Sequence, residues 1–338
     1  MGILRKVAIG VGALVGVLAL AGVGGYAWGS STASKKLSAT YDVHRVDFPI
    51  PFPLTDAEVA ELRTTRASTV PKGQDPMAGV DLAAIANERA VARGKHLTDA
   101  FYVCAECHGA DFGGGVMVDD PAMGRLLGPN LTGGTGSRTL QYTAADWDRM
   151  VRHGVKPSGV SSPMPSRDFF SMSDRELSDI VSYIRSLPDV NKDVPAVTLG
   201  PVGKLLVATG QLQLSADIHP TKHVIDHAAL PPASTADATF GKHLAQTCTG
   251  CHGATFAGGP IIGGPPDWPP AANLTPTALA DWTFDDFSRA LKEGKSKNGV
   301  ALREPMATMP KFAKNMTDTE MQALWAFIKT LPPQPRAP

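Results

Sequence analysis

The chain has 338 residues, which is too long for one small domain and suits two modest domains with linkers. Its 32 Lys and Arg residues balance 32 Asp and Glu residues, and this zero net charge argues against a nucleic-acid-binding protein, which would carry a basic excess. Aromatic residues make up only 7%, whereas Gly (34) and Pro (28) are abundant. We therefore expect loop-rich domains whose small cores need a large apolar group at the centre to be stable.

The N-terminal segment is predicted to be a membrane-spanning helix. Residues 7–29 carry no charge, and as a helix they would be about 35 Å long, against a hydrocarbon core of about 30 Å. Tyr26 and Trp28 stand at the far end, where interfacial aromatic residues are common. The alternative is a cleaved signal peptide, because Ala19-Leu20-Ala21 resembles a cleavage site. We expect residues 1–30 to be an uncleaved anchor.

Two further segments are predicted to connect structured domains. Residues 31–85 are expected to form an extended, Pro-rich strap, and residues 191–234 an interdomain linker that contains one short apolar helix over 202–210. In the linker, His219, His223 and His227 recur every four residues. Because a proline falls inside the set, a regular helix that would align them as a third metal site is not expected.

The four cysteines form two Cys-x-x-Cys-His motifs, which are Cys104, Cys107 and His108, and Cys248, Cys251 and His252. Residues i, i+3 and i+4 share one helix face, so two thiols can bond to one haem while the adjacent imidazole faces its iron. A redox disulfide of this pattern expects a βαβ context that is not visible here. A zinc site expects pairs about 15–20 residues apart, whereas these lie 144 apart. We predict two covalently bound haem c groups, with His108 and His252 as iron ligands.

An internal repeat surrounds the two motifs. Gly-Lys-His-Leu precedes each motif at 94–97 and 241–244, and Asn-Leu-Thr follows at 130–132 and 273–275. Each copy then shows a Met-Pro pair and an apolar helical stripe that begins at a capping box and ends at a proline; the boxes are Ser173 with Glu176 and Thr317 with Glu320. Met172 and Met316 occupy matching helix-entry positions and are expected to be packing residues, and His96 and His243 are expected to be structural.

Each copy resembles a class I cytochrome c domain, over residues 86–190 and 235–335. That family is a small all-α fold that wraps a haem between an N-terminal and a C-terminal helix. The resemblance implies an all-α fold class, with two tandem cytochrome c domains behind an N-terminal transmembrane helix. The tandem arrangement is similar to that of membrane-anchored cytochrome subunits of periplasmic dehydrogenases.

The resemblance also implies where the chain lies, because haem attachment of this type takes place outside the cytoplasm. We expect a single-pass protein of the inner membrane with its haem domains on the periplasmic side. If the N-terminal segment is cleaved, the alternative is a protein secreted to the periplasm.

The second face of each iron is expected to bind a methionine, and His/Met ligation raises the reduction potential. In the first copy we choose Met164, which precedes a proline and lies just before the C-terminal helix, where the family places its ligand. In the second copy Met306 and Met309 compete. Met309 is preferred because it also precedes a proline and stands eight residues before Thr317.

A ligating imidazole needs an acceptor for its other N–H. The resemblance assigns this role to the backbone carbonyl just before the repeated Asn, which belongs to Pro129 in the first copy and to Ala272 in the second. Asn130 and Asn273 themselves have two open roles. They would either bond the haem propionates or cap the local turns.

Two six-coordinate haems in tandem predict a carrier of single electrons. We expect it to act between an extracytoplasmic dehydrogenase and a respiratory cytochrome or oxidase, and not as an enzyme by itself, although it could be the cytochrome subunit of an oxidoreductase complex. The alternative is a dihaem enzyme, such as a peroxidase or a sulfur-compound oxidoreductase, in which one haem face stays open. The methionine available in both copies argues against that alternative.

Overall fold

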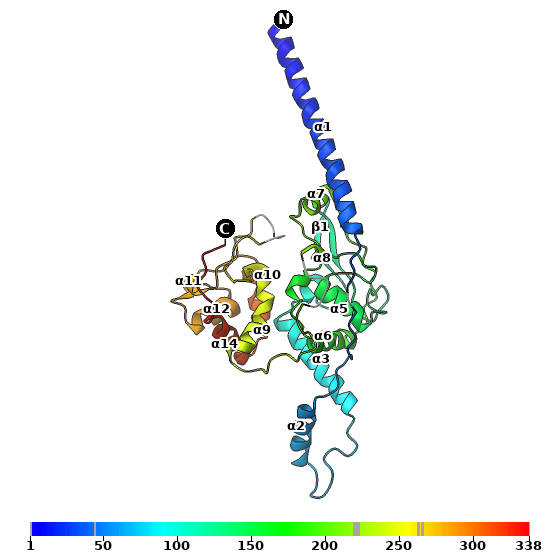
Figure 1. Cartoon of the computed structure of the whole chain (residues 1–338), viewed down its shortest axis with the longest axis vertical. Coiled ribbons are helices and arrows are strands. Elements are labelled where there is room, and N and C mark those ends of the chain that lie inside the picture. The colour runs from blue at the N-terminus through cyan, green and yellow to red at the C-terminus, as the bar shows by residue number, and fades with distance from the viewer. Residues whose placement is uncertain (1, 44, 219–223, 262–263, 265–266, 338) are drawn as a thin grey trace.

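The chain folds into a mainly helical protein with one long helix projecting from it (Figure 1). The computed structural model describes all residues except 1, 44, 219–223, 262–263, 265–266 and 338. Its α-helices are α1 (Gly2–Ser38), α2 (Asp56–Ala67), α3 (Leu82–Ala100), α4 (Ala105–His108), α5 (Ala144–His153), α6 (Asp174–Ser186), α7 (Pro201–Thr209), α8 (Ser215–Ile218), α9 (Ala238–Leu244), α10 (Thr249–His252), α11 (Pro276–Leu279), α12 (Phe284–Glu293), α13 (Pro310–Ala313) and α14 (Asp318–Ile328). Short 3-10 turns are η1 (Ser166–Asp168), η2 (Ala245–Cys248) and η3 (Met306–Thr308), and the strands are β1 (Gly115–Asp120), β2 (Gly124–Gly128) and β3 (Thr198–Leu199).

Helix α1 is long and apolar enough to cross a membrane, with a mean hydropathy of 2.1 over its most apolar window, none of which is buried. Its last turns instead pack against α7, where Ala33 is fully buried. Lys36 Nζ donates a hydrogen bond to the carbonyl of Val207 at 3.0 Å. The helix therefore continues past residue 30, where we expected the anchor to end, and its last turns contact the linker helix α7.

Each copy of the repeat is built on a crossed pair of helices, α3 with α6 and α9 with α14. The glycine of each Gly-Lys-His-Leu motif lies at the crossing. A Cβ atom on Gly94 would lie 2.0 Å from the carbonyl oxygen of Asp179, and one on Gly241 would lie 1.8 Å from that of Ala323. The two backbones can approach this closely only because glycine has no side chain.

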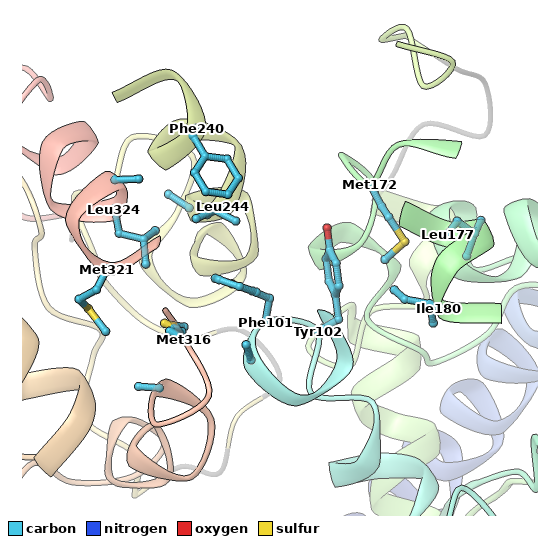
Figure 2. Packing of buried hydrophobic residues seen from close by; sticks show 14 of the residues in the cluster. Phe101, Tyr102, Met172, Leu177, Ile180, Phe240, Leu244, Met316, Met321 and Leu324 are labelled. Carbon is cyan, nitrogen blue, oxygen red and sulfur yellow. The ribbon is translucent and has the colours of Figure 1, made fainter. Parts of the chain in front are cut away.

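The C-terminal helices begin and pack as the sequence predicts. Both capping boxes form, with Ser173 and Glu176 opening α6 and Thr317 and Glu320 opening α14. The apolar stripes are buried, and Met172 and Met316 are buried with them. Figure 2 shows Phe101 and Tyr102 between two groups of core side chains, those of Met172, Leu177 and Ile180 and those of Phe240, Leu244, Met316, Met321 and Leu324. One continuous apolar cluster thus joins the two copies.

Two features depart from the expected plan. Strands β1, β2 and β3 form a small antiparallel sheet in which the linker strand β3 pairs with β2. The strap contains α2, whose N-terminus is closed by a capping box of Thr55 and Glu58 that the sequence analysis overlooked. The strap is also bound to the first copy, because Glu58 pairs with Arg175 at 2.7 Å and Phe48 is buried in the core.

Substituting Gly94→Ala should lower the free energy of unfolding by about 1–3 kcal/mol, because the added methyl group forces the α3 and α6 backbones apart. This loss should exceed the roughly 1 kcal/mol that alanine gains in helix propensity. Thermal unfolding followed by circular dichroism measures the effect. The control is Ala92→Ser, which adds one atom at an exposed position of the same helix. Equal stability of the two variants would show that the close crossing contributes nothing.

Candidate haem sites

The two Cys-x-x-Cys-His motifs form short helical turns directly after the first helix of each copy. The turn of the first copy is closed by a hydrogen bond from the amide of His108 to the carbonyl of Cys104 at 3.0 Å. Burial raises the pKa of the Cys104 thiol to about 12 and that of Cys248 to about 11. Neither group is therefore a thiolate at neutral pH, as a reactive redox cysteine would be. Within the described residues, no group of three or more His, Cys, Asp and Glu side chains is arranged to hold a metal ion.

Each proximal histidine is held by one backbone carbonyl. The Nδ1–H of His108 donates to the Pro129 carbonyl at 3.0 Å, and that of His252 donates to the Ala272 carbonyl at 2.8 Å. Burial lowers the pKa of both imidazoles and outweighs the opposing effect of these hydrogen bonds. Both rings are thus neutral, with the proton on Nδ1 and the Nε2 lone pair available to an iron atom.

The chain leaves each motif through the same strained turn. Phe112 and Phe256 adopt left-handed backbone conformations, with φ of 57° and 58°, which are rare for side chains of this size. Both rings are buried, and they make edge contacts with Tyr183 and Phe327 of the C-terminal helices. Burial of the ring offsets the strain and fixes the turn that follows each haem-attachment motif.

Asn130 and Asn273 bind the polypeptide at matching places. The side-chain oxygen of Asn130 accepts hydrogen bonds from the amide and hydroxyl of Thr132, and its amide donates to the Val190 carbonyl at 2.6 Å. Asn273 makes the same two bonds to Thr275 and donates to the Gln334 carbonyl at 2.8 Å. Of the two roles that the sequence left open, these bonds correspond to capping of the local turn.

Met164 stands in a loop that is fixed from several sides. Its amide donates to Ser162 Oγ at 3.1 Å, and its carbonyl accepts from the amide of Ser166 at 2.8 Å and from the Ser215 hydroxyl. The side chain of Met164 is half-buried. The loop leads into η1 and then into α6, so the helix crossing that positions the first haem motif also positions this methionine.

The second copy has a cavity of about 260 Å³, open to solvent, beside its proximal histidine. Cys251, His252 and Met306 all line it. Met309 is not among its lining residues and instead packs against the main apolar core. The cavity thus brings Met306, and not the preferred Met309, to the same space as His252.

Buried polar groups in the first copy fit the acidic edge of a haem. Trp147 Nε1 and the Nε and Nη2 atoms of Arg152 are buried and have no hydrogen-bond partner among the described residues. The remaining Nη1 of Arg152 donates to Asp148 and Asp174 at 2.8 and 2.7 Å. Haem propionates are acceptors that would satisfy such donors. The sequence pattern identified neither Trp147 nor Arg152 as a functional residue, because their burial beside the site depends on how the domain packs.

The linker histidines do not form a described cluster. His219 and His223 lie outside the described residues. His227 is buried, and its Nδ1–H donates to the carbonyl of Met172 at 2.9 Å. This bond ties the linker to the helix entry of α6.

The chain matches the cytochrome c family over residues 91–188 and 238–332, more than half of its length. It is 22% identical over 272 residues to the fructose dehydrogenase cytochrome subunit of Gluconobacter japonicus, covering 74% of this chain and 54% of that one. It is 24% identical over 267 residues to the cytochrome c subunit of the quinone alcohol dehydrogenase of Gluconacetobacter polyoxogenes, covering 69% of this chain and 54% of that one. It thus spans about half the length of these two relatives. A diheme cytochrome c-type protein of Cereibacter sphaeroides is 22% identical over 256 residues, covering 68% of this chain and 82% of that one.

The chain therefore belongs to the cytochrome c family. Its two matched regions each contain one Cys-x-x-Cys-His motif, so it binds two haem c groups covalently, and its biochemical role is electron transfer.

Replacing Asn130 with Ala should lower the free energy of unfolding by about 1–3 kcal/mol, because it leaves the buried carbonyl of Val190 and the donors of Thr132 without a partner. The low-spin haem spectrum should persist. Denaturant unfolding followed by haem absorbance tests this. The control is Asn191→Ala, whose exposed side chain accepts one bond from Thr135. A shift in reduction potential at unchanged stability would instead assign Asn130 to a propionate.

Proposed function

We propose that this protein relays single electrons between an extracytoplasmic dehydrogenase and a respiratory acceptor, as the cytochrome partner or subunit of that dehydrogenase. The observation that supports this best is the duplicated site, in which a neutral proximal histidine is held by a backbone carbonyl. Both sites have methionines within the same copy. A haem c with a ligand on each face supplies one-electron redox chemistry, and the protein sets its potential and burial.

The proposed division of the chain is the one that the sequence predicts: an anchor over 1–30, a strap over 31–85, haem domains over 86–190 and 235–335, and a linker over 191–234. Helix α1 continues from the anchor into the strap as far as Ser38. We further propose that α1 remains attached and that both haem domains face the periplasm. The uncharged run of residues 7–29 supports retention of the helix, because the apolar part of a cleaved signal peptide is usually only about 7–15 residues long.

The proposed iron ligands are His108 with Met164 and His252 with one of two methionines. The cavity beside His252 supports Met306, whereas the spacing to the following proline supports Met309. Since both stand within one short segment that includes η3, a change of ligand requires only a local rearrangement.

The relay predicts that both irons are low-spin in the oxidised and reduced protein and that neither binds carbon monoxide. Visible absorption spectra of the purified full-length protein, with and without carbon monoxide, check this. A carbon monoxide adduct of one haem in the unmodified protein would mean that one iron has an open face. The function of a dihaem enzyme would then replace electron relay as the proposal.

Met306→Ala and Met309→Ala should separate the two candidate ligands. If the cavity identifies the ligand, Met306→Ala opens one iron and produces a carbon monoxide adduct of one haem, while Met309→Ala keeps both irons low-spin. Met316→Leu is the control, since Met316 is a core methionine near the same segment. The reverse pattern would assign the iron to Met309.

A further inference from the structure

Two histidine–glutamate pairs join the two haem domains. The Nε2 atom of His96 on α3 lies 2.7 Å from Oε1 of Glu320, which opens α14 of the other domain. The Nε2 atom of His243 on α9 lies 2.7 Å from Oε1 of Glu176, which opens α6. All four side chains are half-buried or buried. Each glutamate uses its other carboxylate oxygen in its own capping box.

The two pairs are equivalent by the internal repeat. His96 and His243 are the histidines of the two Gly-Lys-His-Leu motifs, and Glu176 and Glu320 are the third residues of the two C-terminal helices. Each domain therefore presents the same histidine and the same glutamate to the other. This reciprocity is the property of a two-fold symmetric interface, here formed within one chain.

A second reciprocal contact brings each methionine loop to the other domain's haem-attachment turn. In the first direction, Arg167 Nη2 of η1 donates to the carbonyl of Gly250, inside the second Cys-x-x-Cys motif, at 2.7 Å. In the other direction, Lys311 of α13 pairs with Glu106, inside the first motif. Arg167 and Lys311 occupy matching places in the repeat, as do Glu106 and Gly250. A Cβ atom on Gly250 would lie 2.2 Å from Oδ1 of Asp168, so a larger residue at this position would displace that carboxylate.

We propose that His96, His243, Glu176 and Glu320 are positioning residues that hold each haem-attachment turn against the other domain's methionine loop, so that electrons pass directly between the two haems of one chain. This inference rests on the proposed relay. One electron leaves the ferrous haem of one domain, which becomes ferric, and reduces the ferric haem of the other. No proton or further reactant is consumed.

The interface should weaken as pH rises. The hydrogen bond with Glu320 raises the pKa of His96, with Asp99 adding to the effect and Lys95 opposing it. Burial lowers the pKa of His243, but the bond with Glu176 raises it further, and the net direction is upward. Both glutamate pKa values are lowered despite burial, through the bonds from the histidines and the capping hydroxyls.

The sign of the pH effect follows from these directions. A histidine whose pKa is raised by docking stabilises the docked state fully when the pH is below its ordinary pKa of 6.5. This stabilisation is lost as the pH rises through the raised pKa. A glutamate whose pKa is lowered contributes above its ordinary 4.5. Docking is thus strongest between these two values. Asp168 acts in the same direction, because burial raises its pKa to about 6 and its ionisation adds a buried charge at the interface.

The test uses the full-length haem-loaded protein in detergent and the variant Glu176→Gln/Glu320→Gln. Glutamine keeps both capping boxes but removes the carboxylates that bind the imidazoles. Amide hydrogen exchange of α3 and α9 reports docking, and the rate of electron redistribution after sub-stoichiometric reduction reports haem-to-haem transfer. Both are measured at pH about 5.5 and about 8.5, on either side of the ordinary histidine pKa of about 6.5.

In the unmodified protein, protection of α3 and α9 and the redistribution rate should both fall about tenfold between the two pH values, which corresponds to about 1.4 kcal/mol. In the glutamine variant, the protection and the redistribution rate should be, at both pH values, as low as those of the unmodified protein at pH about 8.5. Asp146→Asn, which alters a capping box away from the interface, is the control and should behave as the unmodified protein. Asp168→Asn should retain most of the pH dependence, because the histidines still titrate.

Two results would overturn the proposal. One is that protection and rate in the unmodified protein do not change with pH, and the other is that the glutamine variant has the same protection and rate as the unmodified protein. The first needs no variant, so a folding failure cannot hide the answer. The relay itself fails differently. In that case the domains dock and respond to pH, but no electron passes between the two haems at either pH.

Discussion

The haem sites depend on one steric constraint, the direct contact of two helix backbones at Gly94 and at Gly241. Helix α3 leads into the turn that carries Cys104. The loop that contains Met164 leads through η1 into α6, the helix that α3 crosses at Gly94. Because the crossing fixes α3 and α6 relative to each other, it also fixes the two chain segments that approach a haem from opposite faces. The same logic applies to α9 and α14. A single hydrogen atom in place of a methyl group thus sets the geometry of each site.

The glutamates at the start of α6 and α14 combine a local and a long-range task. A carboxylate has two oxygens, and in Glu176 one oxygen closes the capping box with Ser173 while the other binds His243 of the other domain. Helix initiation and domain docking therefore share one side chain. Since the cap holds the carboxylate in place, little further side-chain entropy has to be lost when the interdomain bond forms.

The sequence predicted what depends on local pattern and on repetition. The Cys-x-x-Cys-His turns, the capping boxes of the C-terminal helices, the apolar helix at the N-terminus and the short helix in the linker were all readable from residues close in the chain. The partners of His96 and His243 were not, because each bond joins residues far apart in sequence, and only the packing of the two domains brings them together. The capping box of Thr55 and Glu58 was sufficient to predict the strap helix α2, but the prolines before it favoured the prediction of an extended strap. The choice between Met306 and Met309 depends on the shape of a cavity, which spacing alone does not encode.

The two copies agree at the interface and differ around their haem sites. Where the first copy has buried Trp147 and Arg152 on α5, the second has Phe287 and a partly exposed Lys292 on α12. Arg152 is paired with the buried carboxylates of Asp148 and Asp174, whereas Lys292 is paired with the exposed carboxylate of Asp318. Buried charges are screened less by solvent than exposed ones, so the two sets of charges act with different strength on their surroundings. The two proposed haem sites therefore have different charged neighbours, although their proximal histidines are held alike. A relay needs both conditions: a symmetric interface that places the two sites side by side, and an asymmetry in their surroundings that gives electron flow a direction.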